Sequence, residues 1–237
     1  MKNKNICAYL ISISFVLFSL LYAVEYCCFD INFYNSEHEK LKIGNSGIAE
    51  HIGISEDDLS ELTEFTLDYL NDYDLSLDKE MVINGKLREV FTDDEKAHMV
   101  DVRTLNITAQ KIMIISLTVF AFSFIYFIFS KHSITDLFKT YLKTILFTIV
   151  FFVILFVWIL IDFDSFWTLF HEIFFAGNKL WILDLNKDIL IMIVPPDFFN
   201  DLVIRIIIFF FIYLFVFALL LFLLKKRKAK NDKRRFI

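Results

Sequence analysis

Two histidines are the residues of this chain whose surroundings best suit chemistry. His98 follows the helix-start pattern Thr-Asp-Asp-Glu at residues 92–95, and Asp101 comes three residues after it. Residues three apart share one face of a helix, so Asp101 can hold one tautomer of the imidazole and stabilise its protonated form. The pKa of an unperturbed histidine is about 6.5, which suits proton transfer at neutral pH. The competing interpretation is an ordinary pair of surface residues.

The second histidine, His171, lies in the aromatic stretch 166–175. From residue 163 onward, aromatic residues recur with helical spacing on one side, and Asp164 and Glu172 fall on the other. This pattern predicts an amphipathic helix in the interface at the outer face of a membrane, with its aromatic side in lipid and His171 at the margin of that side. His171 is then either a catalytic residue or a satisfied interfacial one.

Several other chemistries lack the residues that they need. The chain has no Gly-x-Ser-x-Gly elbow, no second histidine at zinc-protease spacing from His171, and only 5 glycines, in no phosphate-binding pattern. Its cysteines, Cys7, Cys27 and Cys28, do not have the spacing of metal ligands. An acid–base pair that acts on a lipid group at the membrane surface remains, and no metal or other cofactor is expected.

The elements that position these histidines belong to a membrane protein. Of the 237 residues, 57% are hydrophobic and 18% aromatic, and the mean hydropathy is +0.57, which is more apolar than a soluble domain usually is. A helix needs about 20 apolar residues to cross a bilayer. Four stretches have that length: 6–24, 112–130, 141–161 and 202–224. The first is followed by no clear cleavage site, so we expect a retained span and not a signal peptide.

The distribution of charge predicts how these spans are oriented. Residues 25–110 include 20 Asp and Glu against 7 Lys and Arg, whereas the residues after Leu224 are strongly basic. Cytoplasmic loops collect Lys and Arg, so we expect both termini and the short loop after the second span in the cytoplasm. The basic tail at 225–237 is interpreted as an anchor on anionic lipid, and no nucleic-acid partner is expected.

The predicted fold is an all-α polytopic membrane protein, one membrane domain over 1–237 with extracytoplasmic insertions at 25–110 and 162–201. In the larger insertion, Ser55 and Thr92 are helix-start signals, the second forming a capping box with Glu95. In the smaller one, the apolar stretches 180–185 and 189–194 flank a polar turn and predict a short hairpin. We expect the insertions to form a cap of amphipathic helices and this hairpin above four transmembrane helices.

Two stretches resemble the bacterial lipoprotein intramolecular transacylases. One is 88–102, with Phe-Thr-Asp-Asp-Glu at 91–95 and His-Met-Val-Asp-Val at 98–102. The other is Phe-His-Glu-Ile-Phe-Phe at 170–175, followed by Asn178 and Trp181. The plan of four spans with both termini inside also matches, so the similarity covers nearly the whole chain. One departure is Leu185, where the family often has proline.

The resemblance implies an activity in the plasma membrane of a bacterium. Members move the sn-2 acyl chain of a diacylglyceryl-cysteine lipoprotein onto its free N-terminal amine, which gives the lyso-form. The resemblance also implies that His98 and His171 are catalytic, and we expect Asp101 to assist His98. The expected partners are the lipoprotein and membrane lipids. Substrate contacts are expected from residues in or next to the two motifs: Arg103, Phe174, Phe175, Asn178 and Trp181.

Three alternatives stay open. His98, oriented by Asp101, is the preferred base and His171 the donor to the oxyanion or to the leaving oxygen, and the reverse order is the alternative. A covalent route would use Ser165 or Cys28, neither of which has a base at a fixed spacing. Outside enzymes, the chain would be a four-span accessory or sensor protein that binds a partner through its acidic ectodomain.

Overall fold

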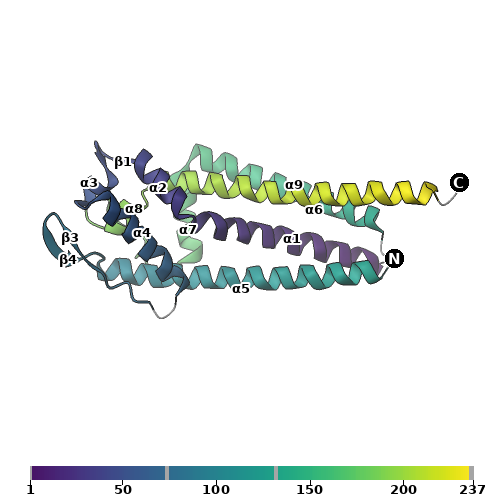
Figure 1. Ribbon diagram of the computed structural model, residues 1–237, viewed down its shortest axis with the longest axis horizontal. Helices are drawn as coiled ribbons and strands as arrows, with labels where there is room; N and C mark the ends of the chain where they lie inside the picture. The colour runs from purple at the N-terminus through teal and green to yellow at the C-terminus, as the bar shows by residue number, and fades with distance from the viewer. Residues whose placement is uncertain (1, 73–74, 131–132, 235–237) are drawn as a thin grey trace. The chain divides into compact units, whose positions relative to one another are not determined.

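The computed structural model describes residues 2–72, 75–130 and 133–234, which form two compact units (Figure 1). Unit 1 consists of Met1–Glu25, Gln110–Ile161 and Arg205–Ile237, and unit 2 consists of Tyr26–Ala109 and Asp162–Ile204. Part of the predicted short cytoplasmic loop, 131–132, and the end of the predicted basic tail, 235–237, lie outside the described residues.

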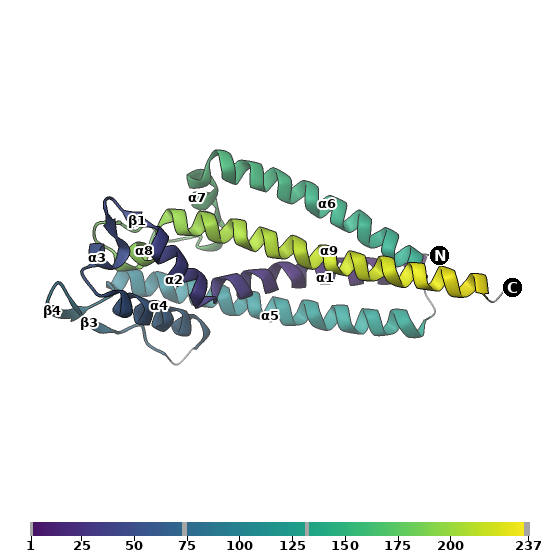
Figure 2. The same cartoon turned by 45° about the horizontal axis from the view of Figure 1, so that its top comes forward.

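Unit 1 is made of segments of four long helices, which run along its length (Figures 1 and 2). They are α1 (Lys2–Cys28), α5 (Asp93–Phe129), α6 (Ile134–Ile161) and α9 (Pro196–Arg234). All four are long and apolar enough to cross a membrane, which confirms the predicted polytopic fold. The apolar part of α5 begins at Ile112, and about 20 residues are enough to cross. The first turns of α5 therefore lie outside the spanning segment.

One cluster of side chains joins the four helices of unit 1. Helices in a bilayer gain no hydrophobic free energy relative to lipid, so close packing and hydrogen bonds hold them together. The Tyr141 hydroxyl donates to the carbonyl of Leu214 at 3.0 Å, and the rings of Phe15 and Phe217 stack with centroids 4.1 Å apart. The cluster takes residues from every long helix: Cys7, Ala8, Ile11, Phe127, Leu137, Tyr141, Phe217 and Leu221.

The ends of the long helices bear on the predicted topology. The first turns of α1, the last turns of α9, the end of α5 and the start of α6 all lie at one end of unit 1 (Figure 1). The basic residues 225–228 are part of α9, so this part of the predicted tail continues the last span as a helix. Basic residues near both chain ends are thus gathered at one end of the unit.

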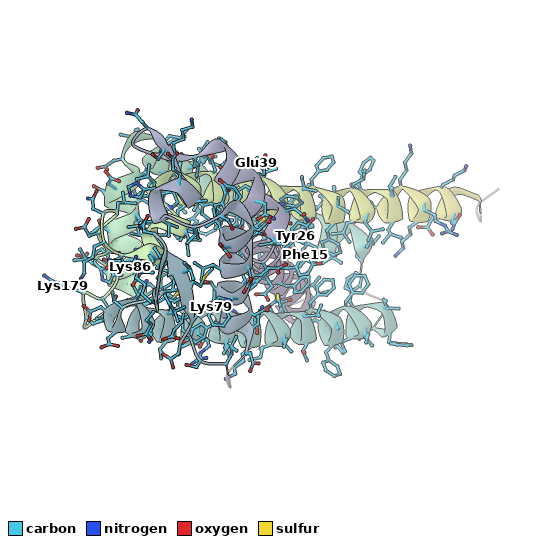
Figure 3. All side chains as sticks on the ribbon, turned by 60° about the vertical axis from the view of Figure 1, so that its left-hand side comes forward. Phe15, Tyr26, Glu39, Lys79, Lys86 and Lys179 are labelled. Carbon is cyan, nitrogen blue, oxygen red and sulfur yellow. The ribbon has the colours of Figure 1, made fainter. Side chains whose placement is uncertain are left out.

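Unit 2 contains short helices and two antiparallel hairpins. The larger insertion forms α2 (Ile31–Lys40), β1 (Lys42–Ile43), β2 (Ser46–Gly47), α3 (Ile48–Ile52), α4 (Glu56–Asn71), β3 (Glu80–Ile83) and β4 (Lys86–Glu89). The smaller one forms α7 (Phe163–Phe174) and α8 (Ile189–Ile193). The longer hairpin turns at Asn84 and Gly85, both with positive φ as an Asn-Gly turn requires. Lys86 beside this turn is exposed (Figure 3).

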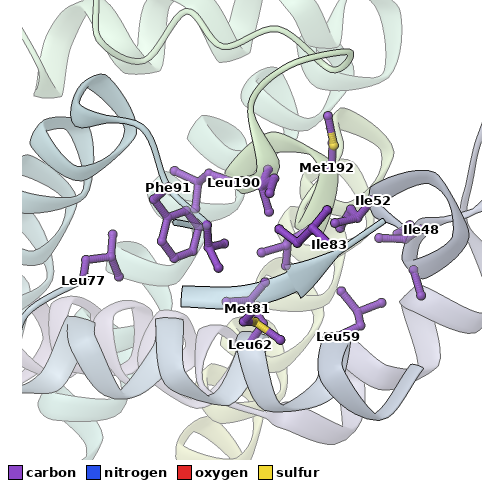
Figure 4. Close-up of a cluster of buried hydrophobic side chains, with 14 of the residues drawn as sticks. Ile48, Ile52, Leu59, Leu62, Leu77, Met81, Ile83, Phe91, Leu190 and Met192 are labelled. Atoms are coloured by element: carbon purple, nitrogen blue, oxygen red, sulfur yellow. The ribbon is translucent and has the colours of Figure 1, made fainter. Parts of the chain in front are cut away.

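The core of unit 2 combines the two insertions (Figure 4). Its buried apolar side chains come from α3, α4, β3, the first turns of α5, and α8, and they include Ile48, Ile52, Leu59, Leu62, Met81, Ile83, Met99, Leu190 and Met192. The larger insertion also bonds to the backbone around α8, since His38 Nε2 lies 2.9 Å from the carbonyl oxygen of Ile193. A carbonyl only accepts, so this nitrogen carries the proton. Residues from the smaller insertion thus complete a core that the larger insertion begins.

Glu95 links the start of α5 to the start of α8. The predicted capping box is present: Thr92 N donates to Glu95 Oε2 at 2.7 Å, and Glu95 N donates to Thr92 Oγ1 at 3.3 Å. The other oxygen, Oε1, accepts from the backbone N of Leu190 at 2.7 Å. The side chain is fully buried, which a carboxylate tolerates only where such donors replace water. The start predicted at Ser55 also forms a capping box, with Asp58.

The hairpin predicted over 180–194 is not formed, so this prediction is wrong. Asp188 Oδ2 accepts from the N of Asp184 at 2.8 Å, and Asp184 Oδ1 accepts from the N of Asn186 at 2.9 Å, which holds this segment in turns. The apolar run after it forms α8. A half-buried strand alternates buried and exposed residues, but four of the five residues of α8 are buried. One helical turn inside a core can bury residues on most of its sides.

Replacing Glu95 with Ala removes the acceptor of three donors: Thr92 N, Thr92 Oγ1 and Leu190 N. We expect Glu95→Ala to destabilise unit 2 by about 2–4 kcal/mol, because the Leu190 amide is buried, Thr92 is half-buried and the lost acceptor is a carboxylate. Hydrogen exchange of the backbone amides at 92–99 and 189–193 in detergent-solubilised protein would measure this loss. Asp94→Ala, which removes an exposed carboxylate from the same turn, is the matched control. Equal protection in both variants would contradict the assignment.

Candidate active site

Unit 2 brings the two predicted histidines together. His98 lies in the second turn of α5, and His171 lies in the last turn of α7. Their ring centroids are 6.1 Å apart with 32° between the ring planes, and the side chains are only 6% and 5% exposed. Residues from both insertions thus share one site that is shielded from water.

The surroundings of His171 fix its tautomer. Its Nδ1 lies 2.8 Å from the carbonyl oxygen of Trp167, one turn earlier on α7. Since that oxygen only accepts, Nδ1 carries a proton and the neutral ring keeps its lone pair on Nε2. Four aromatic rings surround the imidazole within 5.5 Å between centroids: Trp167, Phe170, Phe175 and Trp181. His171 is therefore buried, because Phe175 and Trp181, beyond the helix, cover it.

Burial also governs His98. Its Nδ1 is buried, and within the described part of the chain it has no hydrogen-bond partner. Burial first, and then the nearby His171, lower the pKa of His98 from its usual 6.5 to about 4, and the charge of Asp101 partly opposes this. Burial likewise lowers the pKa of His171, against the hydrogen bond to Trp167. Both imidazoles are neutral at pH 7 and can each accept or donate one hydrogen bond.

A cavity of about 290 Å³ lies next to the histidine pair. One wall is a face of α5, made by Asp101, Thr104, Leu105 and Thr108. The opposite wall is the end of α7 and the residues after it: Phe174, Phe175, Ala176 and Asn178. Phe175 connects the cavity to the pair, because its ring centroid is 5.1 Å from that of His98 and 5.4 Å from that of His171.

The structure places most of the residues predicted for the site around this cavity. Asp101, Phe174, Phe175 and Asn178 line it, and Trp181 packs on His171. Sequence reasoning missed Thr104, Leu105 and Thr108, although their spacing from Asp101 is that of one helix face. Asp101 acts on His98 through charge, while its Oδ2 accepts from Asn178 Nδ2 at 2.9 Å.

Arg103 has a different place. Its Nη1 donates to the carbonyls of Asp72 and Leu75, both at 3.0 Å, and its guanidinium lies 4.1 Å from the ring centroid of Tyr69. These contacts satisfy the end of α4, so Arg103 has a structural role there. Its predicted contact with substrate stays a prediction.

The two candidate nucleophiles of the covalent route are also placed. Ser165 Oγ donates to Asp162 Oδ2 at 2.6 Å, and its backbone N donates to Asp162 Oδ1 at 3.0 Å. Ser165 therefore belongs to the start of α7, where its hydroxyl is bonded to the carboxylate of the N-cap residue Asp162. The carbonyl of Cys28 accepts from the Tyr34 hydroxyl at 2.9 Å. Among the described residues, no three His, Cys, Asp or Glu side chains gather as a metal site.

The family model described as lipoprotein intramolecular transacylase Lit matches residues 9–199. The chain belongs to this family. Membership in the lipoprotein intramolecular transacylases confirms the resemblance found in the sequence and the predicted acyltransferase activity on lipoproteins. No curated protein sequence gives a significant match.

Solved structures of a transacylase of this family have the same fold. The membrane-integral Lit of Bacillus cereus is 20% identical, with a TM-score of 0.78 over 98% of this chain and 99% of that one. Two versions of it, with one histidine replaced by Arg or by Ala, are both 19% identical, with TM-scores of 0.73 and 0.72. The matches cover 99% and 98% of this chain and 95% and 96% of those chains. At this identity, the likeness shows a shared fold.

The burial of His98 predicts how stability depends on pH. A histidine whose pKa is lowered by folding stabilises the protein above its unfolded pKa, because below it the unfolded chain takes up the proton first. Stability should fall as the pH drops from 6.5 to about 4, by up to about 3 kcal/mol for His98. In His98→Asn the fall in thermal midpoint between pH 7.5 and 4.5 should be smaller, and not abolished, because His38 and His171 shift in the same direction. An equal fall in both proteins would contradict this.

Proposed function

We propose that this transacylase moves the sn-2 acyl chain of a diacylglyceryl-cysteine lipoprotein onto its own N-terminal α-amine, with His98 and His171 as the acid–base pair. The observation that carries the proposal is the pair of buried, neutral imidazoles with ring centroids 6.1 Å apart. Two such groups can remove a proton from a nucleophile and supply one to a leaving group at neutral pH.

The reaction needs little more than positioning and proton transfer. The amine and the ester belong to one molecule, so holding them together supplies a large effective molarity. The α-ammonium, with a pKa of about 7.7–8.0 in solution, loses one proton to a histidine. The nitrogen then bonds to the ester carbonyl carbon and gives up a second proton. The bond from that carbon to the glyceryl oxygen breaks, and this oxygen takes the second proton, passed on by a histidine. The product is an N-acyl, S-monoacylglyceryl cysteine.

The hydrogen bonds support an order of roles for the two histidines. The bond from His171 Nδ1 to the Trp167 carbonyl leaves Nε2 as an acceptor, which supports His171 as the base. His98, neutral and with a pKa of about 4, is the better hydrogen-bond donor to the tetrahedral oxyanion and the glyceryl oxygen. This reverses the order that the sequence favours. Asp101 stabilises the positive charge that His98 carries while it passes the second proton from the nitrogen to the glyceryl oxygen.

The surroundings of the pair suit a lipid substrate. On α7, Leu169, Ile173 and Phe174 are exposed at 39%, 61% and 50%, while Trp167 and Phe170 of the same helix pack against His171. Such a face can lie in the interface of a bilayer and accept acyl chains. Trp181 and Phe175 would hold the reacting ester against the imidazoles.

We place this site at the extracytoplasmic face of the bacterial plasma membrane, with both chain termini in the cytoplasm. The positive-inside rule supports this orientation, because the basic residues near both chain ends gather at one end of unit 1. The acidic insertion 25–110 follows the first span and precedes the second, so it belongs on the side opposite to the N-terminus.

The histidines provide the test. His98→Ala and His171→Ala should each lower the rate of lyso-form production at least about 100-fold, because general acid–base catalysis contributes that much. Mass spectrometry of lipoprotein N-termini, from cells with each variant and from purified enzyme, would measure N-acyl, S-monoacylglyceryl cysteine. Wild-type rates in both variants would refute the acid–base pair.

Ser165→Ala and Cys28→Ala are the matched variants for the covalent route. We expect both to keep the wild-type rate, since Ser165 is bonded to Asp162, the N-cap residue of α7, and the proposed reaction uses neither residue. Loss of activity in either one, with an acyl-enzyme detected by intact-protein mass spectrometry, would replace the direct transfer with a covalent route. The non-enzymatic alternative has no support from the family to which the chain belongs.

A further inference from the structure

The three polar side chains of the α5 wall of the cavity, Asp101, Thr104 and Thr108, are hydrogen-bond acceptors. We propose that this wall is the binding site for the α-ammonium of the lipoprotein, with the Asp101 carboxylate as its ion-pair partner. The inference rests on the proposed function and adds to it how the enzyme recognises its nucleophile. It also implies that the cavity distinguishes the charged substrate amine from the neutral amide of the product.

The two threonines of the wall offer acceptors only. Thr104 Oγ1 donates its proton to the carbonyl of Val100 at 2.9 Å, and Thr108 Oγ1 donates to the carbonyl of Thr104 at 2.7 Å. Both residues are exposed on the helix surface. A hydroxyl whose proton is committed to its own helix can only accept from a ligand. Thr104 and Thr108 therefore suit a ligand that brings N–H donors.

Asp101 gives the wall its charge. Its Oδ2 accepts from Asn178 Nδ2 at 2.9 Å, and Asn178 Oδ1 in turn accepts from the N of Leu180 at 3.2 Å. Asn178 is thus held on both sides and fixes the carboxylate without neutralising it. Among the described residues that line the cavity there is no Lys or Arg, so a cation from the substrate meets a single uncompensated negative charge.

The opposite wall fits the rest of the same ligand. Phe174, Phe175 and Ala176 are apolar, and the cysteine that carries the ammonium also carries the diacylglyceryl thioether. The Phe175 ring contacts both imidazoles and also lines the cavity with Asp101, so an amine bound at Asp101 shares this ring as a neighbour with the histidine pair. A primary ammonium has three donors and one charge, whereas the N-acyl product has one donor and no charge.

This difference gives the cavity a role in turnover. Once the acyl chain is on the nitrogen, the ion pair to Asp101 no longer exists, while the apolar contacts of the lipid are almost unchanged. Weaker binding of the product therefore has to come from the polar wall. Lipoproteins whose amine is already acylated would be rejected by the same means.

A non-reactive ligand tests this separately from the chemistry. The probe is a dialkylglyceryl-cysteine peptide with ether bonds in place of both esters, prepared with a free α-amine and, as a second form, with an acetylated one. Full-length wild-type enzyme in detergent should bind the free amine at least about tenfold more tightly than the acetylated form, the effect of one charged hydrogen-bonded contact. Asp101→Asn should bind both forms alike. Undiminished preference in Asp101→Asn, or none in the wild type, would overturn the proposal.

Two controls separate this inference from the acid–base mechanism. Asp94→Asn removes an exposed carboxylate from the same helix and should keep both the preference and the activity. His98→Ala should keep the preference, since the ammonium binds to Asp101; if it loses the preference, Asp101 acts only through His98 and the proposal fails. Full activity of the histidine variants together with an Asp101-dependent preference would refute the catalytic pair and leave this assignment standing.

Discussion

The geometry of unit 2 depends on the hydrogen bonds that the Glu95 carboxylate accepts from Thr92 and Leu190. This carboxylate lies between the first turns of α5 and α8, and its two oxygens replace the water that free helix starts would bind. His98 follows one turn later on α5, and the segment that includes Trp181 leads into α8. Directional hydrogen bonds, which tolerate smaller shifts than apolar packing does, thus set the distance between His98 and the residues around His171.

Burial affects the chemistry of the histidine pair in two opposing ways. It lowers the pKa of both imidazoles, so at pH 7 each ring has one N–H and one lone pair, and each can act without first losing a proton. It also makes each ring a weaker base. A reaction whose nucleophile and ester are in one molecule tolerates a weaker base, because proximity supplies much of the rate. The aromatic rings that reduce basicity also give the acyl chain an apolar place beside the imidazoles.

Sequence patterns predict what is local in this fold. The spans and the starts at Ser55 and Thr92 depend on residues a few positions apart, and the structure confirms them. Both histidines were expected at one membrane face. Hydrophobic periodicity describes single helices, however, and could not predict that the two rings lie next to each other. The bond from Glu95 to Leu190 and the cover of Trp181 over His171 join distant segments. For the same reason, α8 could not be distinguished from a strand: a short apolar run is compatible with both, and the surrounding core decides.

Recognition of the amine follows from what this kind of reaction leaves for an enzyme to distinguish. Substrate and product contain the same peptide, glycerol and acyl chains, so the apolar surface that binds one binds the other. Binding that is equal in both states does not increase turnover. The two differ in charge only at the nitrogen. A carboxylate fixed by Asn178 on the same helix as His98, one turn further on, puts recognition of that charge one turn from the ring that donates to the oxyanion and to the glyceryl oxygen. Glu95 fixes the start of this helix, so one buried carboxylate orients both the binding wall and the catalytic ring.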